Sequence, residues 1–243
     1  MNNRLPAAIL MAAFLDSAAS AATLQFSGFA WTVRTSDHGG PGPNDWDGRN
    51  VWVDAEGFLH LKLQARDGKW SCAEVSTVNR FGFGRYQFQV KGPLDRLDPN
   101  VVLGLFSYPT RDVGADRTHE IDIEFARWGR PASPNGSYTV WPNETGRKPA
   151  SQSFRFELKD PTGWSIHRFT WSPDTLSFQS FNGIGDHDRS PFATWQFHPT
   201  DPARTLSQQP MPVLIDLWSF NGLPPTDGRP VEIIVRSFQF TPP

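Results

Sequence analysis

An all-β fold, arranged as a two-sheet antiparallel β-sandwich, is predicted by three features of the sequence. Apolar and polar residues alternate with a period of two through most of the chain from Thr23 onward, and turn-forming residues interrupt this alternation about every 8–12 residues. No window keeps the period of about 3.6 residues that marks a helix. The 20 Gly and 22 Pro are spread among apolar segments, and 243 residues suit one sandwich domain.

The first pair of strands is predicted at residues 50–54 and 58–63, where alternating apolar residues flank the turn sequence Ala-Glu-Gly. Each later strand is a segment in which β-branched or aromatic side chains alternate with polar ones or form a short apolar run. In chain order, these strands are predicted at residues 73–79, 84–91, 101–108, 119–127, 137–141, 166–171, 176–181, 213–220 and 231–240.

Pro and Gly define the connections between these strands. Residues 94–97 lie between Pro93 and Pro99 and predict a single turn of helix, because proline restricts the chain on both sides. The Gly-rich and Pro-rich segments 37–44 and 224–229 predict ordered loops at the ends of the sandwich.

The N-terminus has the three parts of a secretory signal peptide. Arg4 supplies the positive charge, residues 7–15 form a short apolar stretch, and Ala19-Ser20-Ala21 is a small-residue cleavage motif. The apolar stretch is about half of the ~20 residues that a membrane span needs. We therefore predict a cleaved signal peptide over residues 1–21, one domain over residues 22–243, no membrane span, and a secreted or periplasmic location.

The composition of the chain indicates which classes of molecule it binds. The formal net charge of −2 gives no basic surface for nucleic acid and no polybasic patch for a membrane, so a neutral polymer or a small molecule is expected. The ten Trp and nineteen Phe supply a large core. Cys72 is the only cysteine, which excludes an intrachain disulfide, and we expect it to be buried. No cofactor is expected, and a structural Ca²⁺ is left open because the sequence does not reveal one.

The sequence HEIDIEFARWG at residues 119–129 holds the most unusual pattern in the chain. Glu120, Asp122 and Glu124 occupy every second position, so on a strand they share one face, with neighbours about 7 Å apart. Asp and Glu are poor strand formers and repel one another at this spacing, so fold stability alone would not select them. We call these three residues the acidic row. The opposite face of the strand carries Ile121, Ile123 and Phe125.

Three interpretations of the acidic row are compared. Retaining glycosidases use two carboxyl groups about 5–5.5 Å apart, one as nucleophile and one as proton donor, and two Glu side chains at i and i+4 on a curved strand meet this need. Like charges this close keep one group protonated near neutral pH. A solvated sheet face, offset by basic neighbours, is the structural alternative. A divalent-metal site fits poorly, because a straight strand spreads its carboxylates too far apart for one ion and His119 lies on the apolar face.

The acidic row lies in the segment Glu120-Ile-Asp-Ile-Glu124-Phe, which resembles the active-site strand of glycoside hydrolase family 16 in its form without a bulge. The resemblance implies a concave β-jelly roll that cleaves a β-linked polysaccharide. Further segments resemble that family in the same order, from about Ala30 to the C-terminus. They are Cys72-Ala-Glu74, Phe81-Gly-Phe-Gly-Arg-Tyr86, Val101-Val-Leu-Gly-Leu-Phe-Ser-Tyr108, Gly163-Trp-Ser-Ile-His-Arg-Phe-Thr-Trp171 and Asp216-Leu-Trp218.

Carried over residue by residue, the resemblance implies that Glu120 is the nucleophile, Asp122 its assisting acid and Glu124 the general acid/base. Flat sugar faces stack on aromatic rings, and carboxylates accept hydrogen bonds from sugar hydroxyls. The resemblance implies such sugar-contacting groups at Glu74, Phe106, Tyr108, Asp216 and Trp218. Further cleft candidates are Trp128 and Trp141, whereas the alternation of Trp52, Trp164 and Trp171 with polar residues predicts core positions.

The chain also departs from the family. Licheninases carry Trp and Arg where this chain has Thr118 and Ser76, and the charged segment 109–118 does not match. The Gly-rich segment 37–44 differs as well. These differences concern the walls of the cleft, so they affect the choice of substrate more than the reaction.

The predicted function is that of a secreted retaining glycoside hydrolase, endo-acting on a β-linked glucan or a related polysaccharide. A transglycosylase, in which a sugar hydroxyl replaces water as the acceptor, is one alternative. A non-catalytic carbohydrate-binding jelly roll is the other, although a binding module has no need of the acidic row. The polysaccharide, its linkage, endo or exo action and the oligomeric state are not specified by the sequence.

Overall fold

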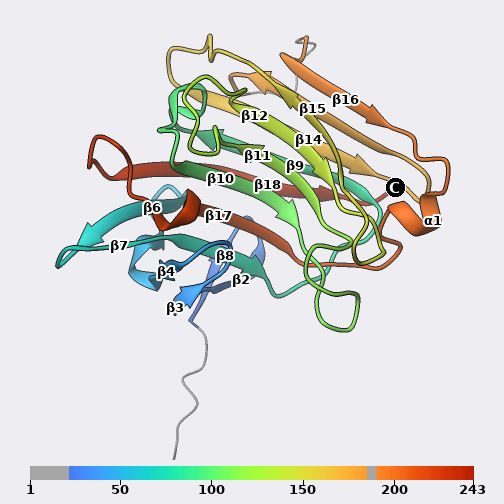
Figure 1. The fold of residues 1–243 in the computed structure, drawn as a ribbon, viewed down its shortest axis with the longest axis horizontal. Helices are drawn as coiled ribbons and strands as arrows, with labels where there is room; N and C mark the ends of the chain where they lie inside the picture. Colours follow the sequence, from blue (N-terminus) through green and yellow to red (C-terminus); the bar gives the residue numbers. More distant parts are fainter. Residues whose placement is uncertain (1–21, 185–189) are drawn as a thin grey trace, which may run out of the picture.

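The computed structural model describes residues 22–184 and 190–243 and has the predicted two-sheet antiparallel architecture (Figure 1). The predicted signal peptide over residues 1–21 lies outside the described residues. Two eight-stranded sheets pack face to face, and every ladder between their named strands is antiparallel. Within the described ranges, no helix is long and apolar enough to cross a membrane.

One sheet, here called the inner sheet, carries the acidic row. Its strands, in spatial order, are β1 (Thr23–Phe26), β2 (Phe29–Val33), β8 (Ala73–Thr77), β17 (Val213–Ser219), β10 (Val101–Ser107), β11 (Ile121–Phe125), β12 (Gly136–Val140) and β13 (Ala150–Phe154). Strands that are distant in the sequence therefore lie side by side: β17 pairs with both β8 and β10.

The outer sheet covers the apolar face of the inner sheet. Its strands, in spatial order, are β16 (Ala193–Phe197), β15 (Leu176–Asn182), β14 (Trp164–Trp171), β9 (Gly84–Lys91), β18 (Val231–Thr241), β6 (Leu59–Arg66) and β5 (Val51–Val53), with β7 (Lys69–Ser71) paired to β6. The remaining elements are short. They are the hairpin β3 (Ser36–Gly39) and β4 (Asn44–Trp46), the 3-10 turns η1 (Gly48–Asn50), η2 (Leu94–Arg96) and η3 (Phe220–Gly222), and the helix α1 (Pro202–Thr205).

Every strand predicted from the alternation is present, with ends that differ by a few residues, and the predicted helical turn at 94–97 is η2. The hairpin of β1 and β2 was not among the predicted strands. Ser27 and Gly28 at its turn both have positive φ, of 52° and 80°, which is typical of a tight two-residue hairpin turn. The segment 37–44, predicted as a loop, instead contributes to the short strands β3 and β4, with Pro and Gly at the tip between them.

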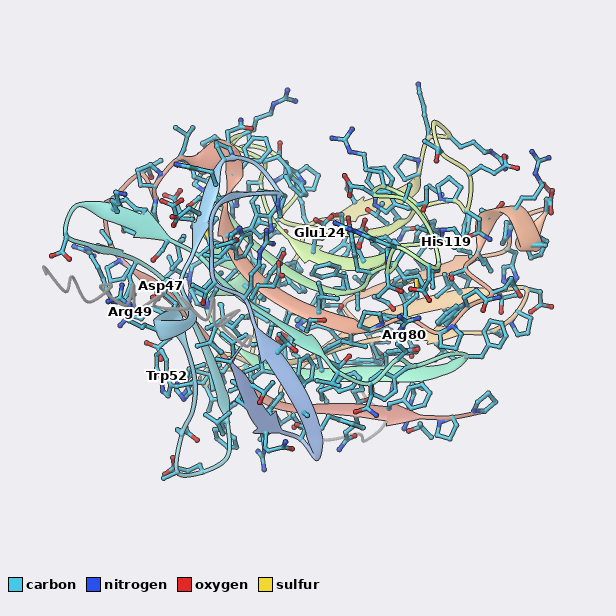
Figure 2. All side chains as sticks on the ribbon, turned by 90° about the horizontal axis from the view of Figure 1, so that it is seen from below. Asp47, Arg49, Trp52, Arg80, His119 and Glu124 are labelled. Atoms are coloured by element: carbon cyan, nitrogen blue, oxygen red, sulfur yellow. The ribbon has the colours of Figure 1, made fainter. Side chains whose placement is uncertain are left out.

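The core lies between the sheets and is rich in aromatic rings. Trp171 is buried, as predicted, and Cys72 is 2 % exposed. Trp52 is not a core residue: it is 36 % exposed and stacks on His60 of the outer sheet, with ring centroids 4.7 Å apart. The prediction failed because β5 is the edge strand of the outer sheet. Val51 is buried, so Trp52, the next residue along the strand, faces outward. Figure 2 shows Trp52 well apart from Glu124.

Replacement of Ile123 tests whether the apolar face of β11 is anchored in this core. Ile123 has no exposed surface, so Ile123→Ala should lower the free energy of unfolding by about 2–5 kcal/mol, through lost burial and the cavity left behind. Urea unfolding measures this change. Val78→Ala is the matched control, because Val78 is 60 % exposed and its loss should change stability by less than about 0.5 kcal/mol. Equal effects of the two substitutions would contradict the placement of β11.

Candidate active site

The register of the inner sheet brings acidic residues from three strands into line. Gly104 of β10 lies opposite Glu124 of β11 on one side and opposite Asp216 of β17 on the other. Asp216 in turn lies opposite Glu74 of β8. Directly paired residues point to the same face of a sheet, so three carboxyl groups and one glycine cross the sheet in a single line.

A second line runs across the sheet two residues along. Phe106 lies opposite Asp122 on one side and Leu214 on the other, and Asp122 is paired with Thr139 of β12. At the next step, the backbone oxygen of Glu120 accepts a hydrogen bond from the backbone N–H of Trp141 at 2.9 Å. The acidic row therefore runs along one strand and meets residues of the neighbouring strands at each position.

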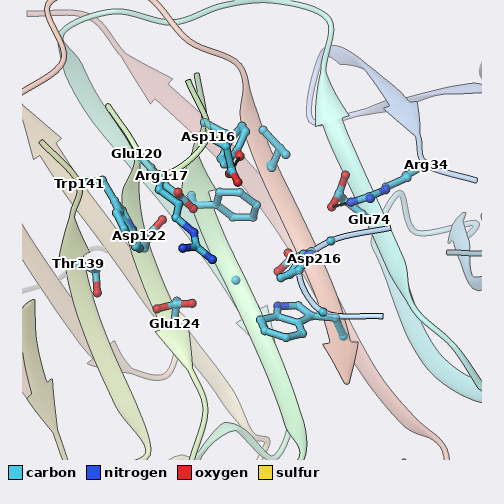
Figure 3. Close-up of a pocket in the computed structure, with 18 of the residues that line it drawn as sticks. Arg34, Glu74, Asp116, Arg117, Glu120, Asp122, Glu124, Thr139, Trp141 and Asp216 are labelled. Carbon is cyan, nitrogen blue, oxygen red and sulfur yellow. Dashed lines mark hydrogen bonds and ion pairs between the residues drawn. The ribbon is translucent and has the colours of Figure 1, made fainter. Parts of the chain in front are cut away.

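All eight site residues predicted from the sequence line one cleft of about 800 Å³ on this face (Figure 3). Trp128 and Trp141, the further candidates, line it as well. The apolar residues of β11 point the other way, into the core between the sheets. The eight residues are Glu74, Phe106, Tyr108, Glu120, Asp122, Glu124, Asp216 and Trp218.

Strand β11 begins later than predicted, because the chain before it turns sharply. Arg117 and His119 both have a positive φ of 63°, a left-handed conformation that interrupts extended structure. The half-buried His119 contacts Thr118 Oγ1 through Nδ1 at 2.8 Å, and it is not among the cleft-lining residues. Glu120 thus stands at the entrance to the strand, beside the loop formed by residues 109–118, here called the 109–118 loop.

Gly104 is needed at the centre of the cleft floor. A Cβ atom at this position would lie 2.4 Å from Asp216 Oδ1 and 3.3 Å from Phe106 Cδ1, so any side chain would displace the Asp216 carboxyl group. Asp216 is 3 % exposed, and its Oδ1 atom has no hydrogen-bond partner among the described residues. An orphaned buried oxygen in a cleft is suited to pairing with a hydroxyl group of a ligand.

Two of the carboxyl groups are held by donors from neighbouring elements. Trp141 donates from Nε1 to Asp122 Oδ2 at 3.0 Å, and Asp122 also shares a side-chain hydrogen bond with Glu120. Arg34 donates from Nη1 to Glu74 Oε2 at 2.9 Å, while its guanidinium lies over the Trp46 ring, 4.2 Å from the centroid. These contacts hold Asp122 and Glu74 in fixed orientations on the floor of the cleft.

Burial raises the pKa of every member of the acidic row. It raises the pKa of Glu120 to about 8 and the pKa of Glu124 to about 7. The pKa of Asp122 lies well above its usual value, first because of burial and then because Glu120 and Glu124 are close. Groups this close exchange protons as one unit, so the acidic row retains protons around neutral pH.

The pKa values of Asp216 and Glu74, in the line of residues that crosses the sheet, are raised in the same way. Burial raises the pKa of Asp216 well above its usual value, and the Glu74 charge adds to this. Burial also raises the pKa of Glu74, although the Arg34 guanidinium opposes that shift. Each of these shifts favours the protonated form, and a protonated carboxyl group can donate as well as accept hydrogen bonds.

Several cleft residues were missed by sequence reasoning. Arg34 comes from the N-terminal part of the chain, and the 109–118 loop contributes Asp116 and Arg117. Gly40, Pro41 and Gly42, at the tip of the β3–β4 hairpin, also reach the cleft. No local pattern marks these residues, since they enter the site only through the packing of loops. Within the described residues, no group of three or more His, Cys, Asp or Glu is arranged to hold a metal ion.

No protein-family model matches the chain, and no curated protein matches it at a significant level. Solved structures do match. The β-glucanase of Bacillus licheniformis has a TM-score of 0.64 and 20 % identity, over 88 % of this chain and 92 % of that one. A glycoside hydrolase family 16 protein of the Bacteroides ovatus mixed-linkage glucan PUL, in complex with a G4G4G3G product, has a TM-score of 0.65 and 13 % identity, over 87 % and 94 %.

A third match is described as an immunostimulatory antigen and pseudo β-1,3-glucanase of Mycobacterium tuberculosis. It has a TM-score of 0.64 and 20 % identity, over 88 % of this chain and 91 % of that one. Such identities are too low to transfer an activity from one protein to another. The matches nevertheless extend over most of both chains, so this protein has the jelly-roll fold of the family 16 glycoside hydrolases.

Proposed function

We propose that the chain is a divergent member of glycoside hydrolase family 16 and a secreted, retaining endo-glycosidase of a β-linked glucan or a related polysaccharide. The observation that carries the proposal is the acidic row on the floor of an open cleft, with protons retained around neutral pH. A solvated sheet face would leave these carboxyl groups in water with ordinary pKa values. Acid/base chemistry instead requires one carboxyl group that can give up a proton near neutral pH.

In this reaction Glu120 attacks the anomeric carbon, and the bond between that carbon and the glycosidic oxygen breaks. Glu124 gives its proton to the departing oxygen and afterwards removes a proton from the water that releases the glycosyl enzyme. Glu124 lies within β11 and Glu120 directly precedes it, so the course of the chain along the inner sheet sets their separation. The raised pKa of Glu124 suits the donor role, because the group is still partly protonated near pH 7.

Asp122 adjusts the protonation of the nucleophile. It shares a hydrogen bond with Glu120, and Trp141 fixes its other side. A proton that resides on Asp122 leaves Glu120 ionised and ready to attack. The high pKa of Asp122, due to burial and to its two acidic neighbours, makes it a suitable holder for that proton.

The walls of the cleft suit a sugar polymer. Trp128 and Trp218 pack with ring centroids 6.1 Å apart at one side, and Phe106 and Tyr108 pack at 6.1 Å toward the 109–118 loop. Aromatic rings of this kind stack on the flat faces of sugars. One structural match is described as a β-glucanase and another as a family 16 protein of a mixed-linkage glucan PUL in complex with a product, and both support a glucan as the first substrate to test.

Replacement of Glu120 provides the direct test of this function. Glu120→Gln and Glu124→Gln should each lower the release of reducing ends from mixed-linkage glucan by about 10³-fold or more, because each removes a group that acts on the reacting bond. Circular dichroism checks the fold. Glu56→Gln, on the exposed turn between β5 and β6, is the matched control and should keep parental activity.

Full activity in Glu120→Gln would overturn the assignment. Binding of glucan without turnover by the parent protein would favour the carbohydrate-binding alternative. Transfer of the glycosyl group to an added sugar acceptor, seen by mass spectrometry, would favour the transglycosylase.

Glu120→Gln should also change how stability depends on pH. The folded state retains a proton on Glu120 up to a pKa of about 8, whereas an unfolded glutamate releases it near ~4.3. Between these values the folded state binds more protons, so the free energy of unfolding falls as the pH rises. Gln cannot ionise, and the variant should be more stable than the parent by about 1–3 kcal/mol near pH 8 and equal to it near pH 4. Urea unfolding between pH 4 and pH 8 measures this change. A difference in the free energy of unfolding that stays constant across the range would contradict the raised pKa of Glu120.

Trp141→Phe should alter the pH profile of the reaction. The indole N–H lowers the pKa of Asp122, so its removal should raise that pKa further. Loss of this donor also leaves the Asp122 carboxyl group less firmly oriented beside Glu120, so kcat should fall by about 10-fold. Because the acidic row would release its protons later, the alkaline limb of the kcat profile should move to higher pH. A changed KM with an unmoved pH profile would mean that Trp141 acts only as a stacking surface.

A further inference from the structure

We propose that Arg117 binds the neutral sugar unit that lies over the acidic row, with its guanidinium donating hydrogen bonds to the hydroxyl groups of that unit. The inference rests on the proposed function and adds to it a residue that determines which sugar is accepted. Figure 3 shows the Arg117 side chain extending over the acidic row, with its head toward Glu124 and Asp216. The segment that carries it does not resemble the matching segment of licheninases, so its position follows from this structure.

The 109–118 loop holds Arg117 in place over the cleft. Arg80 binds Asp112 at 2.6 Å and ties the loop to the β8–β9 connection. Tyr108 donates its hydroxyl hydrogen to Asp116, and Thr118 Oγ1 donates to the Ala115 oxygen at 2.6 Å. Asp116 and Thr118, the residues on either side of Arg117, are therefore held by side-chain hydrogen bonds within the loop.

The backbone conformation at Arg117 favours another residue type. Its φ of 63° is left-handed, which glycine adopts easily and a long side chain does not. Strain of this kind is found where a side chain is required by function. The turn itself therefore gives no reason for a long side chain at this position.

The charge of Arg117 is uncompensated. Among the described residues, no hydrogen bond or ion pair holds its guanidinium, whereas Arg34, the other arginine of the cleft, is paired with Glu74. Asp122 and Asp116, which line the same cleft, accept hydrogen bonds from Trp141 and Tyr108 instead. The N–H donors of the Arg117 guanidinium are therefore available to a ligand in the cleft.

The other groups of the cleft indicate that this ligand is neutral. Six acidic residues line the cleft against two arginines, and burial raises the pKa of five of the six. Negative charge is therefore disfavoured in this cleft, and the carboxylates of an acidic polymer would be disfavoured as well. A sugar hydroxyl group can both accept and donate a hydrogen bond. It can accept one from the Arg117 guanidinium and donate one to Asp216 Oδ1, which lacks a partner. The six acidic residues are Glu74, Asp116, Glu120, Asp122, Glu124 and Asp216.

The test measures binding in the Glu120→Gln background, so that a ligand is not consumed. Isothermal titration calorimetry compares a neutral mixed-linkage glucan oligosaccharide with its counterpart in which the primary alcohols are oxidised to carboxylates. Arg117→Ala and Arg117→Gly should each weaken binding of the neutral oligosaccharide by about tenfold or more, and Arg117→Lys should recover part of it. Arg111→Ala, an exposed arginine of the same loop outside the cleft, is the matched control and should bind as its parent does.

Arg117→Gly separates binding from a structural role. Glycine relieves the left-handed backbone, so the melting temperature should stay level or rise while binding falls. Equal binding by the Arg117→Gly and Arg111→Ala variants would overturn the inference, as would tighter binding of the carboxylated oligosaccharide. If Glu120→Gln alone binds neither oligosaccharide, the proposed function fails first, and that result is distinct from a loss that depends on Arg117.

Discussion

The alternation of side chains along β11 is the constraint on which the rest of the site depends. Ile121, Ile123 and Phe125 are fully buried between the sheets, and their burial fixes which face of the strand is turned inward. A shift of one residue in register would place three carboxyl groups in the core and three apolar groups in the cleft. The core therefore determines where the acidic row stands, and the hydrophobic effect supports a set of groups that oppose one another electrostatically.

The inner sheet places further acidic residues beside this row, and their burial and mutual repulsion lower the stability of the fold. Asp216 stands beside a glycine that makes room for it, and Glu74 is kept in place by an arginine from outside the sheet. Burial without full compensation raises the pKa of each group, so the folded state retains protons that the unfolded chain would release. Protein stability is thereby reduced at alkaline pH, and in return the cleft has proton donors at the pH where it would work.

The surroundings of the acidic row are built differently from the row itself. The floor is made of paired strands, whose backbone hydrogen bonds hold every position relative to its neighbours, which suits residues that act on a bond. The walls include loops, such as the 109–118 loop and the tip of the β3–β4 hairpin, that can vary without disturbing the sheet. The 109–118 loop, whose sequence does not match that of licheninases, forms part of these walls and carries Arg117. In the proposed function, the reaction depends on the sheet and the choice of substrate depends on the loops.

The sequence by itself determined every strand longer than five residues and the faces of those strands, because alternation along a strand is a local property that a short window reveals. Alternation therefore identified the two-sheet fold and the acidic row, whereas Asp216 and the other sugar-contacting positions were implied only by the resemblance to glycoside hydrolase family 16. The tertiary structure alone decided which loops reach the cleft, since Arg34, Gly40 and Arg117 meet there through contacts between distant segments. It also decided that Trp52 is exposed, because position at the edge of a sheet depends on strand order, which no local pattern encodes.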